Sequence, residues 1–124
     1  MGVGLDYVVV FVTVPSREVG LSIARDLVSA RLAACVNVVD GLRSVYFWEG
    51  RVEEDNEALL VIKSRRDRLD ELVRFVRERH PYKVPEVIAL PVVGGFVDYL
   101  RWIDEVVGVG GNALESRGLG GGDA

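Results

Sequence analysis

Cysteine and histidine are almost missing from this chain, which has one of each, Cys35 and His80, in 124 residues. A single cysteine excludes an internal disulfide framework and is typical of a reducing compartment. The two residues leave only one Cys/His pair for nucleophilic catalysis, and no serine occupies a nucleophile-elbow motif. An enzyme is therefore the least favoured class of protein.

Long apolar runs and an excess of basic charge are missing as well. The longest purely apolar runs, such as 8–12 and 58–62, are far below the roughly 18 residues of a membrane-spanning helix. The first residues lack a basic region followed by an apolar one, so we expect no signal peptide. The formal net charge is −4, whereas nucleic-acid binding needs a net basic face. These absences predict a cytoplasmic protein that binds neither membrane nor nucleic acid.

Nucleotide-binding motifs find no support. The chain has no Walker-type loop, and the dinucleotide fingerprint that 108–113 formally matches follows a predicted helix and opens no βαβ unit. Glycine dominates from Gly108 onward, a composition that buries too little apolar surface to order itself. We therefore predict one domain over 1–107 and a flexible tail over 108–124.

The rest of the chain alternates between strand-like and helix-like patterns. Ser16 is the expected N-cap of the first helix, and Pro81 is expected to end the second. The predicted strands are 7–14, 33–39 with a break at Asp40–Gly41 and a resumption at 44–48, 52–63 after a turn at 49–50, and 86–92; the predicted helices are 16–31, 66–79 and 96–107.

This order predicts an α+β, ferredoxin-like βαββαβ domain: a four-stranded antiparallel sheet with a C-terminal helix added. Right-handed crossovers place both main helices on one face of the sheet. The strands, however, are apolar on both sides, as Val8 to Val12 and Leu59 to Ile62 illustrate. Since a wet apolar sheet face is costly and invites aggregation, we expect copies of the chain to cover it, and we predict an obligate oligomer.

Three residues are candidates for metal binding. Alternation along the second strand places Cys35 on the face away from the helices, where a thiolate suits soft or borderline metals, although it also fits a small buried hydrophobe. His80 suits a ligand or a pocket base, and equally a helix C-terminal cap. Glu57 differs from the other hairpin acids, which are typical of a solvated tip, because it starts an apolar run, and we expect it to be partly buried.

Aromatic and charged residues at the strand and helix junctions suggest a cleft between subunits. Aromatic rings in such positions serve also as core or interface anchors. Lys63 either meets an anionic ligand or marks the end of the third strand. The residues that we expect to shape the site are Tyr46, Trp48, Lys63, Tyr82, Glu86 and Trp102.

Many of these residues lie in short segments that follow one another in the same order as in the CutA family of divalent-cation-tolerance proteins, and by these segments the chain resembles that family. The resemblance extends from about residue 7 to 103. Any one segment is weak by itself, and the ordered set is specific. The matching segments are Thr13–Ser16, Leu32–Asn37, Ser44–Gly50, Glu57, Lys63, His80–Glu86 and Tyr99–Trp102.

The resemblance implies a homotrimer of ferredoxin-like subunits, similar in architecture to the PII signal-transduction proteins, with a role in tolerance of copper and other divalent metals. Cys35 and His80 match positions that are implicated in metal binding in the family, and Glu57 is a third candidate. No resident cofactor is implied beyond copper or another divalent cation. The alternatives are a PII-like sensor of a small anion, and a trimeric scaffold that docks an unidentified protein partner.

Overall fold

The computed structural model describes residues 6–108, which form a four-stranded sheet and three α-helices. The element order confirms the ferredoxin-like α+β pattern with its added C-terminal helix. The elements are β1 (Tyr7–Val14), α1 (Arg17–Ser29), β2 (Cys35–Trp48), β3 (Arg51–Arg65), a 3-10 turn η2 (Arg66–Arg68), α2 (Leu69–Arg79), β4 (Val87–Pro91) and α3 (Val97–Val107).

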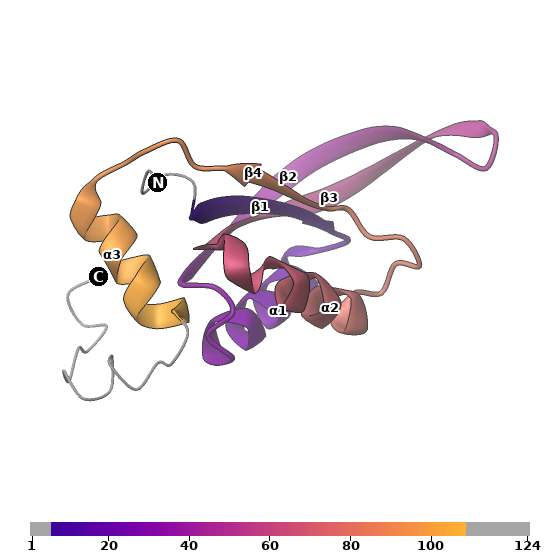
Figure 1. Ribbon diagram of the computed structural model, residues 1–124. Helices are drawn as coiled ribbons and strands as arrows, with labels where there is room; N and C mark the ends of the chain where they lie inside the picture. Colours follow the sequence, from indigo (N-terminus) through magenta and orange to yellow (C-terminus); the bar gives the residue numbers. More distant parts are fainter. Residues whose placement is uncertain (1–5, 109–124) are drawn as a thin grey trace.

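The sheet has the strand order β2-β3-β1-β4, and all neighbouring strands are antiparallel. Both α1 and α2 lie against one face of it, as the pattern predicted (Figure 1). Alternate residues of β1 and β3, among them Val10, Val12, Leu60 and Ile62, are fully buried on this face and form the core. We call the other side of the sheet the open face.

The helix ends follow from local side-chain chemistry. Ser16 caps α1 as expected, because its Oγ accepts a 3.2 Å hydrogen bond from the backbone N–H of Val19. The second helix was predicted from Arg66, but its first three residues form the 3-10 turn, and α2 begins at Leu69. It ends at Arg79, since Pro81 disfavours a helical conformation for His80, which has φ −81° and ψ 135°.

The expected break in the second strand is wrong. Strand β2 continues through Asp40 and Gly41 with one extra residue, because Val39 pairs with Leu59 and Leu42 pairs with Glu57. Gly41 has φ +81°, a conformation that glycine adopts without steric cost, so the ladder resumes after the bulge. Because of the extra residue, odd-numbered residues of β2 face the open side before the bulge, and even-numbered residues face it after the bulge. The bulge therefore turns every second residue from Leu42 to Trp48 toward the open face.

The open face is apolar, which confirms that the strands carry apolar side chains on both sides. It includes Val9, Phe11 and Val61, and on the edge strand Ile88 and Leu90 are 52% and 46% exposed. Helix α3 lies at the end of the sheet away from the β2–β3 hairpin (Figure 1). The number of copies in the assembly stays a prediction.

Helix α3 is attached to the sheet through Tyr7. The buried Tyr7 hydroxyl donates a 2.6 Å hydrogen bond to Oδ2 of Asp104, and Arg65 forms an ion pair with the same carboxylate. Leu100, Ile103 and Val107 pack around the Tyr7 ring in a small second core. The attachment is therefore both apolar and charged.

The predicted tail lies outside the described residues, apart from Gly108, which caps the end of α3. No helix within residues 6–108 is both long and apolar enough to span a membrane.

Candidate functional site

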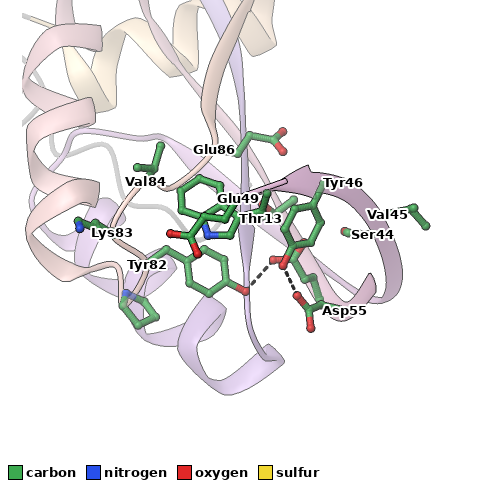
Figure 2. Close-up of a pocket in the computed structure, with 13 residues that line it drawn as sticks. Thr13, Ser44, Val45, Tyr46, Glu49, Asp55, Tyr82, Lys83, Val84 and Glu86 are labelled. Carbon is green, nitrogen blue, oxygen red and sulfur yellow. Dashed lines mark hydrogen bonds between the residues drawn. The ribbon is translucent and has the colours of Figure 1, made fainter. Parts of the chain in front are cut away.

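A cleft of about 810 Å³ lies between the β2–β3 hairpin and the loop that joins α2 to β4 (Figure 2). Its floor includes Thr13 at the end of β1. The rings of Tyr46, Trp48 and Tyr82 form aromatic walls. Four carboxylates also line it, those of Glu49, Asp55, Glu57 and Glu86. The bulge at Gly41 is what turns Tyr46 and Trp48 toward this side of the sheet.

Glu57 is the most buried carboxylate of the cleft, with 8% of its surface exposed. Its Oε2 accepts a 2.7 Å hydrogen bond from the hydroxyl of Tyr82. Burial of Tyr82, together with this bond to a carboxylate, raises the pKa of the phenol. The Tyr82 hydroxyl therefore stays protonated and donates a hydrogen bond to Glu57. The predicted partial burial of Glu57 is confirmed.

A second tyrosine and carboxylate pair lies beside the first. The hydroxyl of Tyr46 donates a hydrogen bond to Asp55, two residues before Glu57 on β3. That bond, with a smaller contribution from burial, raises the pKa of Tyr46 to about 12. In Figure 2 the hydroxyl ends of Tyr46 and Tyr82 point toward one another, and Asp55 lies beside the hydroxyl of Tyr46. Both tyrosine hydroxyls therefore donate their hydrogen bonds to carboxylates of the protein.

His80 lies behind the cleft and holds the loop in place. Its Nε2 lies 2.7 Å from the carbonyl oxygen of Thr13, and its Nδ1 accepts a 3.1 Å hydrogen bond from the backbone N–H of Tyr82. Since a carbonyl only accepts, the ring proton is assigned to Nε2. The imidazole is 7% exposed and lies 4.7 Å from the Tyr82 ring, centroid to centroid. His80 thus connects β1 to the loop and positions Tyr82.

Cys35 lies at the other end of the sheet. It pairs with Lys63, whose Nζ is 3.9 Å from the sulfur and also donates a hydrogen bond to Asn37. Burial and the neighbouring Cys35 raise the pKa of Tyr99 on α3. Lys63 lies six residues beyond Glu57 on β3, which is about 20 Å at the rise of an extended strand. Cys35 and Glu57 therefore do not meet within one chain.

The structure thus brings some of the predicted site residues together and leaves others apart. His80 and Tyr82 meet in the loop, and Trp102 lies on α3 beside Tyr99, 5.4 Å between ring centroids. In one chain Cys35, Lys63 and Trp102 are remote from the cleft. Those that line it are Tyr46, Trp48, Glu57, Tyr82 and Glu86.

Two further residues of the site were missed by the sequence reasoning. Asp55 was assigned to a solvated hairpin tip, and Thr13 was given only as part of the first strand and of a segment that matches the family, without a role in the site. The signal for Asp55 is its spacing from Glu57, because residues two apart on a strand share a face. The role of Thr13 depends on its backbone carbonyl, for which the sequence carries no signal.

The cleft is negative. Four carboxylates line it, and Lys83 is the single lysine among the lining residues. The Lys83 side chain points away from the cleft in Figure 2. Within residues 6–108, however, no three side chains of His, Cys, Asp or Glu come close enough to hold a metal ion. One chain therefore offers an electrostatic attraction for cations without a preassembled coordination shell.

Comparison with known proteins identifies the family. The model of the CutA1 divalent ion tolerance protein family matches residues 8–106. The chain belongs to this family. The divalent-cation tolerance protein CutA of Thermus thermophilus is 50% identical over 100 residues, which cover 81% of this chain and 97% of that protein.

Other CutA relatives agree. The chloroplastic CutA 1 of Oryza sativa is 53% identical over 96 residues, and the chain spans about half the length of the curated plant relatives that it matches. The crystal structure of CutA1 from Oryza sativa has a TM-score of 0.81 at 48% identity, covering 85% of this chain and 96% of that one. The Thermus thermophilus structure also has a TM-score of 0.81, at 49% identity, covering 82% and 99%. The name of the Thermus thermophilus protein refers to tolerance of divalent cations.

Proposed function

We propose that this protein binds divalent metal ions, copper first among them, in clefts at the subunit boundaries of a homotrimer, and that it acts in metal tolerance without catalysis. The observation that carries the proposal is the buried carboxylate of Glu57 in a cleft with a surplus of negative charge. A cation that enters such a cleft meets a carboxylate whose desolvation is already part of the folded state.

The proposed ligands are Glu57, Cys35 and His80. Because Cys35 lies about 20 Å from Glu57 along the strand pair, a site that uses both needs Cys35 from a neighbouring copy. The apolar open face supports such an assembly. His80 enters the coordination shell only by exchanging a hydrogen bond to Thr13 or Tyr82 for the metal, so Glu57 has the stronger support of the two.

Copper is favoured by the thiol. Cys35 supplies a soft thiolate ligand, and Cu(II) generally binds a given site most tightly among the divalent first-row metals, while carboxylates alone suit harder cations. A cysteine that is not in a disulfide agrees with a reducing compartment, and we propose the cytoplasm as the location.

A PII-like sensor of small anions is the second candidate, and the charge of the cleft opposes it. Lys83 is the one lysine among the lining residues, and Lys63 is engaged by Asn37 at the other end of the sheet. An organic anion would face four carboxylates in place of hydrogen-bond donors.

Calorimetric titration of the full chain with Cu(II), Cu(I) and Zn(II), with chelator competition, tests the proposal. We expect binding that is at least tenfold weaker in Glu57→Gln and unchanged in Glu54→Gln. Glu54 is a matched control, because it lies on the opposite face of the same hairpin and pairs with Arg43. Parallel Cys35→Ser and His80→Ala variants identify the remaining ligands. Equal affinity in the wild type and Glu57→Gln would reject Glu57 as a ligand, and no binding at all would reject the metal function.

A further inference from the structure

Asp40 and Gly41 form the only Asp–Gly pair in the chain. In such a pair the backbone nitrogen of the glycine can attack the side-chain carboxyl group of the aspartate and close a five-membered succinimide ring. Glycine permits this attack because it has no side chain to obstruct the ring and because its backbone reaches conformations closed to other residues. Whether the reaction proceeds in a folded protein depends on how the surrounding structure holds the two residues.

The fold leaves this pair outside the strand ladder. Strand β3 provides no partner for Asp40 or Gly41, since the register passes from Val39 directly to Leu42 at the bulge. Both residues of the pair are exposed, and β2 is an edge strand of the sheet. Nothing lies within 4 Å of a Cβ built on Gly41. The chain around the pair therefore has room to rearrange, and water reaches it from the solvent.

The two reacting groups already lie together. The backbone N–H of Gly41 donates a 2.8 Å hydrogen bond to Oδ1 of Asp40. A carbonyl C–O bond is about 1.2 Å long, so the Cγ of Asp40 lies within about 4 Å of the nitrogen that would attack it. The side chain of Asp40 is therefore folded back toward the peptide bond that follows it.

Asp55 is exposed as well but is held differently. It pairs with Ser44 on β2, and the next residue, Asn56, pairs with Arg43, so both remain in the ladder. Asn56 also has a side chain, which obstructs ring closure at its nitrogen. Asp55 is therefore an internal reference for Asp40, with the same carboxyl group in the same hairpin but without the bulge or the glycine.

We propose that Asp40–Gly41 is a site of spontaneous succinimide formation and of isomerisation to isoaspartate in the folded protein. The nitrogen of Gly41 forms a bond to Cγ of protonated Asp40, a Cγ–oxygen bond breaks, and one water molecule is released. Water then opens the imide at either carbonyl. Cleavage of the nitrogen–Cγ bond restores aspartate, and cleavage of the bond to the main-chain carbonyl carbon leaves the chain running through the side-chain carboxyl group. No oxidant or other reactant is required.

The isoaspartyl linkage adds one carbon, the Cβ of Asp40, to the main chain at the bulge. One extra residue at this point already determines which side chains of β2 face the open side beyond it. The added carbon therefore changes the connection between the body of the sheet and the β2–β3 hairpin. The proposal is independent of the metal function, because neither reacting residue is a proposed ligand.

Incubation of the native full chain at pH 6 and 37 °C tests the proposal. Isoaspartate is detected with a carboxyl methyltransferase specific for this linkage, and it is located by mass spectrometry of peptides with electron-transfer fragmentation. We expect at least tenfold more isoaspartate at Asp40 than at Asp55. The rate at Asp40 should be no more than fivefold below that in the chain unfolded in urea.

Asp40→Glu is the matched variant, because it keeps the carboxylate but requires a six-membered ring. It should lower the isomerised fraction of the peptide that contains position 40 at least tenfold. Circular dichroism checks that the variant is folded, and the comparison of Asp40 with Asp55 within one wild-type sample needs no variant.

Two results would overturn the proposal. Isoaspartate that forms at Asp40 only in urea would show that the fold protects the bond, and equal amounts at Asp40 and Asp55 would show that the bulge confers no selectivity. The protein is incubated as it assembles in solution, so any cover that a neighbouring copy places over the edge of β2 is part of the test. Neither result bears on the metal titrations, which depend on other residues.

Discussion

The hydroxyl of Tyr82 lies 2.7 Å from Oε2 of Glu57, and this bond connects the loop after α2 to the point where β3 enters the core. Its two residues come from opposite walls of the cleft. On the loop side, the N–H of Tyr82 is held by His80, which in turn contacts the carbonyl of Thr13. The cleft therefore keeps its shape through a continuous chain of hydrogen bonds from β1 to β3.

Removing the Tyr82 hydroxyl should destabilise the fold. Tyr82→Phe leaves a buried carboxylate without its donor, and we expect a loss of about 1–3 kcal/mol in the free energy of unfolding. Denaturant unfolding measures it. Tyr46→Phe is the matched control, because the bond from Tyr46 to Asp55 is exposed and water can replace the lost donor, so its loss should cost clearly less than that of Tyr82→Phe. Equal losses in the two variants would show that the burial of Glu57 has no energetic weight.

Gly41 should resist substitution although space surrounds it. Nothing lies within 4 Å of a Cβ built there, so the cost of Gly41→Ala comes only from the backbone at φ +81°. We expect about 1–2 kcal/mol of destabilisation in thermal or denaturant unfolding. Gly94→Ala has the same free space without the left-handed backbone and should change stability by about 0.5 kcal/mol or less. A harmless Gly41→Ala would mean that the bulge tolerates another backbone conformation.

Alkaline pH should loosen the attachment of α3. Burial of Tyr7 and its bond to Asp104 raise the pKa of this phenol from about 10 in the unfolded chain to about 12. Between these values the unfolded chain has lost the proton that the folded chain keeps. The Tyr7 contribution to stability is therefore complete below pH 10 and is lost as the pH rises toward 12.

The difference between the wild type and Tyr7→Phe isolates this contribution. We expect denaturant unfolding between pH 9 and pH 11 to show a smaller loss of stability in Tyr7→Phe. Tyr46 and Tyr82 titrate in both proteins, so their contributions cancel. Parallel curves for the two proteins would contradict a raised Tyr7 pKa.

A charge on the open face should break the proposed oligomer. Ile88 lies on the edge strand β4 with half of its side chain exposed, and Ile88→Lys places an ammonium group on the surface that we expect another copy to cover. Sedimentation velocity should show a smaller species than in the wild type. Val93→Lys is the control, since Val93 is 96% exposed and outside the sheet. An unchanged sedimentation coefficient in Ile88→Lys would place the interface elsewhere.

Much of the fold follows from local signals in the sequence. The apolar run of β1, the Ser16 cap, the turn at Glu49–Gly50 and the stop at Pro81 each depend on residues next to one another. The order of the elements indicated the ferredoxin-like topology, and the strands with apolar side chains on both sides indicated an apolar open face. The burial of Glu57 could also be predicted, because a carboxylate that starts an apolar run lies next to the buried part of its strand.

Only the tertiary structure decided which of the candidate residues meet. The break expected at Asp40–Gly41 is a bulge, and whether a strand resumes after a glycine depends on its partner strand, which no local signal specifies. That single extra residue turned Tyr46 toward the cleft. His80 forms hydrogen bonds with Thr13 and Tyr82 because the sheet order places the end of β1 next to the loop that joins α2 to β4. The sequence determined which chemistry was present; the packing of β1, β3 and the loop determined that Glu57 shares a cleft with Tyr82, while Cys35 lies at the far end of the same strand pair.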